Sequence, residues 1–557
     1  MNPALIEELK ILIKGDVMTD EATLMQHSHD ASLFEVKPQV VVFPKDDADV
    51  QALIKFVTKH KKEHPELSLT GRSAGTDMAG GSINDSIIVA FGKYFNKIGD
   101  IKNQIGTAQP GVFYRDFEKE TLKQNWIFPS YPASRELCAI GGIVNNNSGG
   151  EKSLAYGKTE KYLKRVKVVL ADGKTYEFKA LKRHELRAKM AQNDFEGELY
   201  TKIYKLIKRN YETLQAAKPH VSKNSAGYFL WNVWDKEKDI FDLTQLWTGA
   251  QGTLGMLLEA DLKLVPVHKH REMEIIFLHD MAHLGEIIDA VMPLKPESFE
   301  SYDDNTLKLA LRFFPEFAKQ LGLGGLIESG LAFAPAFMQM FVGKLPKLIL
   351  QIDFTGDDPE ELKQKIATLR EKLAPLHPQT KIAVEDQEKR YWLVRRESFN
   401  LLRNKIRDKH TAPFIDDFVI QPHQIAEVLP QITAVVQKHP EFIYTVAGHI
   451  GDGNFHIIPL VDITNPVARK AIPEIAEEVY RIITKYKGSI TGEHNDGLIR
   501  TPYLEQMYGK EVIKLFEEVK KAFDPHGIFN PRKKVHGDLT WAMNHIRTNW
   551  DTIKLPK

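Results

Sequence analysis

The segment from 447 to 456 carries two histidines at a spacing suited to metal chelation. Asp452-Gly453 is a preferred centre of a type I′ turn, which predicts a β-hairpin with His449 directly opposite His456. Directly opposed side chains share one face of a sheet, with Cβ atoms about 4.5–5.5 Å apart. The pattern therefore predicts two imidazoles that can bind one metal ion.

A second segment, from 492 to 497, places Glu493 next to His494. Glu493 can be a third, anionic metal ligand, and His494 can be an acid or base. Neighbours on a regular strand face opposite ways, so both reach one site only if the strand ends there, as the surrounding Gly and Asn residues favour. Two histidines and a carboxylate with an open position are typical of a catalytic zinc or similar divalent site.

Three glycine-rich loops, at 69–83, 141–157 and 247–257, are the other chemical feature. Glycines let a backbone approach a ligand closely, and successive N–H groups in such loops can hold anionic oxygens. None of the loops matches the dinucleotide fingerprint or the P-loop pattern. Together, they favour an extended cofactor that carries phosphate.

Composition excludes several classes of protein. The 75 Lys and Arg residues are balanced by 74 Asp and Glu, which argues against a general nucleic-acid binder. The single cysteine, Cys138, excludes an internal disulfide and a cysteine-held iron–sulfur cluster. The N-terminus lacks the apolar core of a signal peptide, and no apolar run is long enough to span a membrane. We therefore expect a cytoplasmic protein.

The elements that must position these residues fall into three zones of a chain of 557 residues. Residues 25–267 mix short β-rich runs with helices, whereas 268–460 alternate strands with charged helices, such as Pro359–Leu373, in an α+β pattern. Two long helical patterns follow residue 465. The apolar segment Leu321–Leu345 is either a buried helix pair or a surface that touches a membrane or a partner.

In order and spacing, these segments resemble the vanillyl-alcohol-oxidase/p-cresol-methylhydroxylase type of flavoprotein. Within it they resemble the FAD-linked D-lactate and D-2-hydroxyglutarate dehydrogenase branch, which includes glycolate oxidase subunits. The resemblance covers nearly the whole chain, including a first βα unit at Pro38–Pro44, a turn at Ala171–Gly173 and a C-terminal signature at Asp524–Pro531.

The resemblance implies an α+β fold with a two-subdomain FAD-binding domain at 1–267. It also implies an antiparallel-sheet substrate, or cap, domain at 268–460. Residues 461–557 would complete the active site, with helices that return to the FAD domain.

The same resemblance implies that the loop 71–82 cradles the FAD pyrophosphate. This loop holds Arg72 and Ser73 and no histidine that could attach the flavin, so we expect non-covalent FAD. The residues that the resemblance assigns to FAD binding are Arg72, Ser73, Ala74, Gly75, Thr76, Asp77, Gly80, Gly81, Ser82, Pro110, Gly111, Pro132, Ala133, Ser134, Gly141, Gly142, Asn145, Asn147, Ser148, Gly149, Gly252, Thr253, Gly255 and Asn530.

The resemblance further implies that His449, His456 and Glu493 bind Zn or Mn and that His494 is the catalytic base. Two residues depart from the family pattern: Ile458 stands where close relatives often have Asn, and Asn495 replaces Gly after the Gly-Glu-His motif. The first departure makes 2-hydroxyglutarate a weaker substrate candidate than D-lactate.

Arg395 matches the family's substrate-carboxylate position, since arginine binds a carboxylate through two hydrogen bonds. The alternative is a solvated helix face on which Glu388 or Glu397 is the counter-charge.

The expected activity is a metal-assisted, FAD-dependent oxidation of a D-2-hydroxy acid, with D-lactate favoured. Electrons would pass to an external acceptor, which is a quinone, a cytochrome or an electron-transfer flavoprotein. Two other functions stay open: a non-redox flavoenzyme like the alkyl-glycerone-phosphate synthases, and a non-catalytic FAD subunit of an oxidase complex. A homodimer and a peripheral contact with the inner membrane also stay open.

Overall fold

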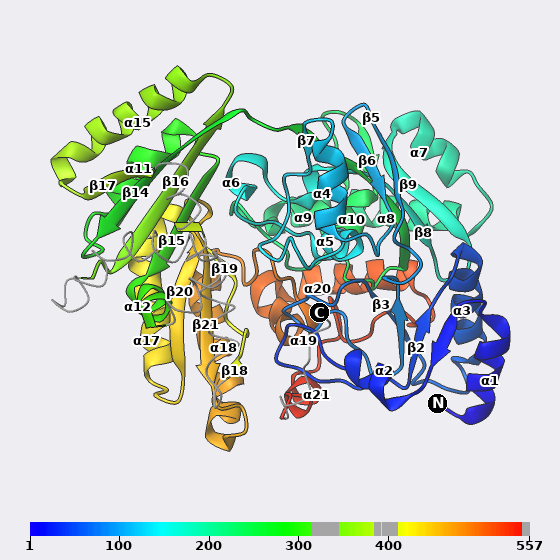
Figure 1. Cartoon of the computed structure of the whole chain (residues 1–557). Helices are drawn as coiled ribbons and strands as arrows, with labels where there is room; N and C mark the ends of the chain where they lie inside the picture. Colours follow the sequence, from blue (N-terminus) through cyan, green and yellow to red (C-terminus); the bar gives the residue numbers. More distant parts are fainter. Residues whose placement is uncertain (313–344, 384–390, 393–409, 549–557) are drawn as a thin grey trace.

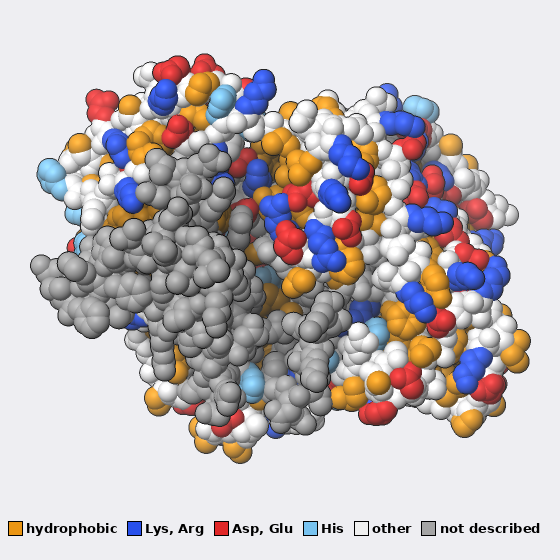
Figure 2. Space-filling model, in the orientation of Figure 1, with side chains coloured by type: hydrophobic (Ala, Val, Ile, Leu, Met, Phe, Trp, Pro, Cys, Tyr) orange, Lys and Arg blue, Asp and Glu red, His pale blue; other side chains and the backbone are white. Residues whose placement is uncertain are grey.

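The computed structural model describes residues 1–312, 345–383, 391–392 and 410–548. Figure 1 shows two halves side by side: the N-terminal half contains two main sheets, and the other half contains one large sheet. In Figure 2, basic and acidic side chains are interspersed over the visible surface of the N-terminal half. This mixture agrees with the nearly balanced charge of the chain.

The first sheet is small and mostly parallel. Its strand order is β1 (Asp16–Met18), β2 (Val40–Phe43), β4 (Ile87–Ala90) and β3 (Leu69–Arg72), and β2, β4 and β3 run parallel. Helix α3 (Asp47–His60) follows β2, and the Asp46 side chain caps its first turn by accepting from the N–H of Asp49. Strand β3 forms the start of the first glycine-rich segment, and the loop itself follows Arg72.

The second sheet is antiparallel, with strands in the order β10 (Trp234–Asp235), β11 (Ile240–Asp242), β9 (Thr175–Lys182), β8 (Leu163–Val169), β12 (Met256–Lys263), β6 (Ile105–Ala108) and β5 (Ile98–Lys102). Helix α5 (Ile140–Asn146) lies against β12. Helix α20 (Leu504–Phe523), which bends at Gly509, packs against α8 (Phe195–Arg209). The C-terminal segment therefore returns to the N-terminal half, as the fold prediction expects (Figure 1).

The third sheet is antiparallel, with strands in the order β17 (Gln379–Ala383), β14 (His270–Leu278), β16 (Leu348–Gly356), β15 (Ser298–Asp303), β20 (Ile443–His449), β21 (Asn454–Val461) and β18 (His410–Thr411). The short strand β19 (Phe418–Val419) also pairs with β21. These pairings confirm the predicted α+β fold, in which the region after the FAD-binding part contains an antiparallel sheet.

The two faces of this third sheet differ in chemistry. Apolar side chains such as Phe299 and Ile352 pack under α11 (Leu284–Val291), α15 (Pro359–Leu373) and α17 (Ile425–Gln437). The other face carries buried polar residues, including Glu300 and Gln351, which oppose each other on β15 and β16. A buried polar face needs partners, so this is the face on which a site is expected.

Two predictions fall at least partly outside this description. Of Leu321–Leu345 only Leu345 belongs to the described residues, and Arg395 lies outside them altogether. In the part of the chain that is described, no helix combines the length and the apolar character needed to cross a bilayer.

Candidate active site

The hairpin that carries the two histidines forms, but its predicted register is wrong. His449 pairs with Asn454, and His456 pairs with Ala447, so the register is shifted by two residues. Ile450–Asp452 form a 3₁₀ turn, and Gly453 takes a left-handed conformation with φ of 67°. A type I′ turn also needs a positive φ at Asp452, which that residue does not adopt.

A residue from a distant part of the chain lies beside this turn. The Lys223 ammonium lies 3.0 Å from Oδ2 of Asp452, and both side chains are buried. A shift of two residues keeps every side chain on its face, whereas a shift of one would have moved it to the other face. His449 and His456 therefore still share a face, with ring centroids 5.3 Å apart.

Glu493 joins the two histidines, as the sequence predicts. Its Oε1 lies 3.3 Å from Nε2 of His449, and its Oε2 lies 3.8 Å from Nε2 of His456. One ligand atom from each of the three residues lies within 4.8 Å of the others, and all three residues are buried. The arrangement is compact enough to bind one divalent cation.

Each of these three side chains has an outer partner. Nδ1 of His449 lies 2.6 Å from Oε1 of Glu300, and Nδ1 of His456 lies 2.9 Å from the backbone oxygen of Asp416. Lys223 donates to Oε1 of Glu493 at 2.7 Å. Metal-binding histidines typically donate their second N–H to a carboxylate or carbonyl, which leaves Nε2 for the ion. The donor set thus fits a metal site.

The charges in this group follow from their partners. Burial opposes ionisation, but Lys223 and His449 hold the pKa of Glu493 well below its usual range. Burial also lowers the pKa of His456, and the nearby His494 lowers it further. An ionised carboxylate and a neutral imidazole are the forms that bind a metal. For His449, the effect of Glu300 outweighs burial and raises its pKa to about 9.

His494 lies on the other side of His456. Their rings stack with centroids 5.2 Å apart, and Nδ1 of His494 lies 2.7 Å from Oδ2 of Asp416. Asn495 and Gly497 take positive φ values of 67° and 51°, so the backbone does not continue as a regular strand after the Glu-His pair. Burial would lower the pKa of His494, but Asp416 and Asp417 raise it to about 9.

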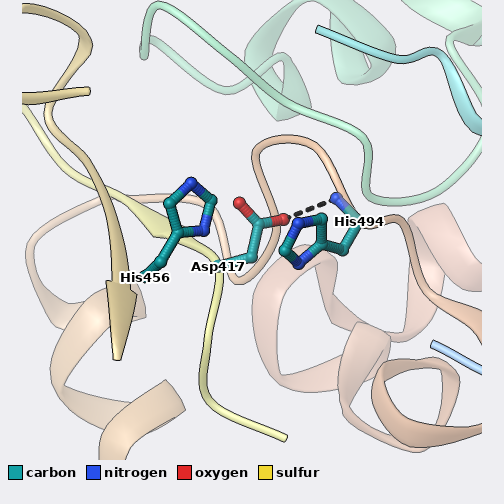
Figure 3. A group of neighbouring side chains, drawn as sticks. All are labelled: Asp417, His456 and His494. Carbon is teal, nitrogen blue, oxygen red and sulfur yellow. Dashed lines mark hydrogen bonds between the residues drawn. The ribbon is translucent and has the colours of Figure 1, made fainter. Parts of the chain in front are cut away.

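Asp417, His456 and His494 form a second group with the spacing of metal ligands (Figure 3). The Asp417 carboxylate is, however, already occupied. Its Oδ2 accepts from the backbone N–H groups of Glu493 and His494 at 2.8 and 2.7 Å, and its Oδ1 accepts from Asn454. We therefore assign the metal-binding geometry to His449, His456 and Glu493.

The first glycine loop has the features of an anion cradle. Gly75 and Gly80 have positive φ values of 69° and 83°. Within the described residues, the backbone N–H groups of residues 73–76 donate no hydrogen bond. Backbone donors without partners at a bend of this kind are suited to phosphate oxygens, so the loop fits the pyrophosphate of a dinucleotide.

Segments that are far apart in the sequence meet at this loop. A Cβ atom on Gly141 would lie 2.5 Å from both Pro110 Cβ and Ser73 Oγ, so glycine is required there. Asn145 Oδ1 accepts from the N–H of Gly252 at 3.1 Å. The predicted cofactor segments at 73, 110, 141–145 and 252 therefore form one continuous surface.

Asn530 joins the same surface from the C-terminal signature. Its Nδ2 donates to the backbone oxygens of Gly81 and Gln251 at 2.8 and 2.5 Å, and its Oδ1 accepts from Thr70. Other predicted cofactor residues have internal roles: Thr253 bonds to Ala250 and Tyr228, and Asn147 caps α5.

The histidine cluster lies directly against these loops. Asn146 Nδ2 donates to the backbone oxygen of Glu493 at 2.7 Å. The N–H of Gly497 donates to Gln251 Oε1 at 2.8 Å, and that of Leu498 donates to the oxygen of Ala79. The candidate metal and base residues are thus one hydrogen bond away from the candidate cofactor loops.

Several residues of the site were not predicted. Asp416 and Asp417 interrupt the apolar run 414–420, and two acidic residues in a buried run are a signal of function that the sequence offered. Glu300 and Lys223 gave no such signal, because Lys223 is 270 residues from its partner Glu493.

Two protein-family models match the chain. The FAD binding domain model matches residues 38–179, and the model of the C-terminal domain of FAD linked oxidases matches residues 267–534. The first match contains the glycine loop at residue 73, and the second contains the histidine cluster.

Known proteins similar to the chain include two dehydrogenases. D-2-hydroxyglutarate dehydrogenase of Escherichia coli (strain K12) is 26% identical over 530 residues, which cover 93% of this chain and 50% of that protein. The chain thus spans about half the length of the first curated relatives that it matches. D-lactate dehydrogenase of Anaerostipes hadrus is 24% identical over 551 residues, covering 96% of this chain and 97% of that protein.

Among solved structures, p-cresol methylhydroxylase with substrate bound has a TM-score of 0.67 at 16% identity and covers 96% of both chains. At this identity, the likeness shows a shared fold.

Proposed function

Because the chain carries the FAD binding domain and the C-terminal domain of FAD linked oxidases, we propose that it is an FAD-dependent dehydrogenase of D-2-hydroxy acids. The observation that carries the proposal is that Glu493 of the histidine cluster, and the residues 497–498 that follow it, contact the candidate cofactor loops at 146, 251 and 79. D-lactate is the favoured substrate, as the D-lactate dehydrogenase relative supports. The proposal includes the division of the chain at 1–267, 268–460 and 461–557.

FAD would be held without a covalent bond by the loop at 73–76 and by the surface that Gly141, Gly252 and Asn530 complete. When bound, FAD supplies the acceptor for the hydride that leaves the substrate carbon. The glycines allow close approach of the backbone, and the N–H groups of the loop would bind the pyrophosphate oxygens.

His449, His456 and Glu493 would hold a divalent ion, Zn or Mn, with a position left open for substrate oxygens. Such an ion would supply Lewis acidity to the substrate hydroxyl. Lys223 and Glu300 would keep Glu493 and His449 in the ligating orientation.

His494 would accept the hydroxyl proton on Nε2, because Nδ1 is committed to Asp416. Asp416 and Asp417 raise the pKa of His494 to about 9, which favours the imidazolium in the metal-free protein. A divalent cation bound nearby would lower that pKa and so favour the neutral ring, in which Nε2 can accept a proton. Arg395, which lies outside the described residues, would bind the substrate carboxylate. The product is a 2-keto acid, and an external quinone, cytochrome or electron-transfer flavoprotein would reoxidise the flavin.

The test is anaerobic mixing of the purified chain with D- and L-2-hydroxy acids, followed by flavin absorbance. We expect D-lactate to bleach the flavin and L-lactate to leave it unchanged. Failure of every D-2-hydroxy acid to bleach a fully FAD-loaded protein would reject the proposal. Bleaching by the isolated chain would also reject a purely non-catalytic subunit.

A further inference from the structure

We propose that Asp416 is a positioning residue that fixes where the ring protons of His494 and His456 lie. The inference rests on the proposed function, because it assigns His494 as the base and His456 as a metal ligand. It adds a residue that lies outside the two histidine-containing segments, 447–456 and 492–497.

Asp416 reaches both imidazoles with different atoms. Its carboxylate Oδ2 lies 2.7 Å from Nδ1 of His494, and its backbone oxygen lies 2.9 Å from Nδ1 of His456. A carbonyl oxygen and an ionised carboxylate can only accept hydrogen bonds. Both Nδ1 atoms must therefore carry the proton when the rings are neutral, and both Nε2 atoms keep a lone pair.

The proposed metal binding and proton transfer both need a lone pair on Nε2. Nε2 of His456 is the nitrogen that faces Glu493, at 3.8 Å from its Oε2, and would bind the ion. Nε2 of His494 is left to take a proton from a substrate hydroxyl. Asp416 thus leaves Nε2 of His456 available to bind a metal ion and Nε2 of His494 available to accept a proton.

Asp416 is itself held firmly. Its side chain is fully buried, and Oδ1 forms an ion pair with the equally buried Arg500. Arg500 also donates to the backbone oxygen of Asn495 at 3.2 Å. The guanidinium of Arg500 favours the ionised form of this carboxylate. The carboxylate therefore remains an acceptor.

The next residue fixes the backbone of the same segment. Asp417 Oδ2 accepts from the N–H groups of Glu493 and His494, while Asp416 holds the His494 ring. The dipeptide 416–417 thus controls both where His494 sits and how its ring is turned. A carboxylate that orients an imidazole also stabilises the imidazolium that forms when the base takes up a proton.

When the substrate alcohol is oxidised, its hydroxyl proton would pass to Nε2 of His494, and bound FAD would supply the acceptor for the hydride of the C–H bond. The Nδ1 proton stays on His494 and remains hydrogen-bonded to Asp416. Asp416 is therefore not protonated in the step.

The test variant is Asp416→Asn. An asparagine can donate its amide N–H to Nδ1, which favours the tautomer with the proton on Nε2 and blocks that atom as a base. In stopped-flow mixing with D-lactate, we expect the limiting rate constant of flavin reduction to fall about 10²-fold. The substrate dissociation constant, the FAD content and the metal content should change little, because the backbone contact to His456 is kept.

A double-mutant cycle separates positioning from general damage. If Asp416 acts through His494, Asp416→Asn should cost nothing further in a His494→Ala background. A full additional loss in that background would overturn the proposal, and so would an unchanged rate in the single variant. Reduction of the wild-type flavin in the same experiment shows that the proposed function itself holds.

Asp416→Asn leaves Arg500 buried without its carboxylate, so a control for the loss of a buried carboxylate is needed. Glu274→Gln removes a buried carboxylate of the third sheet that pairs with the partly exposed Arg370, and it should not change flavin reduction. If Asp416→Asn does not fold, proton NMR of the wild-type protein with ¹⁵N-labelled histidine decides. We expect a strongly deshielded imidazole N–H signal that His494→Ala removes; its absence from the wild type would refute the dyad.

Discussion

The histidine cluster and the loop at 73–76 are built in opposite ways. In the cluster, Nδ1 of each histidine has a partner within the chain: Glu300 for His449, the carbonyl of Asp416 for His456, and the carboxylate of Asp416 for His494. In the loop, the backbone N–H groups have no partner among the described residues. The cluster is ordered by the chain itself, whereas the loop relies on its ligand for hydrogen bonds.

This difference separates two kinds of function. Groups that move protons must hold a fixed geometry, so the chain supports them with buried ion pairs such as Asp416–Arg500. Groups that bind a phosphate-bearing cofactor need open donors, because a donor paired within the chain would have to be released first. Substitutions in the cluster should therefore change the reaction rate, and substitutions at the loop should change cofactor affinity.

The largest expected effect tests the cluster side. His494→Ala should lower the limiting rate of flavin reduction by D-lactate about 10³-fold, because a general base is lost. The FAD content, measured by absorbance, should stay that of the wild type. The exposed His283→Ala is the control. Normal reduction by His494→Ala would contradict its role, and loss of FAD would break the separation between cluster and loop.

The next effect concerns the metal. His456→Ala should lower bound zinc or manganese, measured by mass spectrometry of the dialysed protein, and should lower the reduction rate about 10²-fold. The structural reason is that Nε2 of His456 is one of three donors within 4.8 Å. Full metal occupancy in this variant would show that the ion, if present, is held elsewhere.

Much of this cluster could be predicted because strands have a period of two. The face shared by His449 and His456 follows from their spacing, and the error of two residues in register leaves that face unchanged. The glycine loops could be found because glycine adopts positive φ without steric cost, as Gly75 and Gly80 do.

The partners of the cluster could not be predicted, because they come from distant parts of the chain. Lys223 lies 270 residues from Glu493, and Asp416 lies 78 residues from His494. No local pattern links such pairs. The turn at which the register prediction is wrong also has such a distant partner, because Lys223 pairs with Asp452 in the 3₁₀ turn that stands in place of a type I′ turn.

A smaller effect tests the loop side at two matched glycines. A Cβ atom added at Gly142 in α5, or at Gly285 in α11, would meet nothing within 4 Å. Alanine in a helix is more favourable than glycine, so both apoproteins should gain about 0.5–1 kcal/mol of stability. Gly142→Ala should weaken FAD binding about tenfold, about 1.4 kcal/mol, whereas Gly285→Ala should not. Equal FAD affinities, measured by titration of apoprotein, would remove Gly142 from the cofactor surface.

The smallest effect follows from a buried acid next to the loop. Asp30 accepts hydrogen bonds from Ser32 and Ser82, and burial and the nearby Asp77 raise its pKa to about 6. In the unfolded chain, its pKa is near 3.9. Between these values the folded protein keeps a proton that the unfolded chain has lost, so this group lowers stability as the pH rises through about 4 to 6.

Asp30→Asn removes this titration and should change the pH dependence of the apoprotein. Relative to the variant, the wild-type thermal midpoint should fall by a few degrees, on the order of 1 kcal/mol, between about pH 4.5 and about pH 7.5. The exposed Asp100→Asn serves as the control. A constant difference across this range would mean that Asp30 is charged at low pH already. Because Asp30 is mostly ionised at neutral pH with either pKa, that outcome would leave the anion cradle unchanged and would contradict only the effect of burial and Asp77 on Asp30.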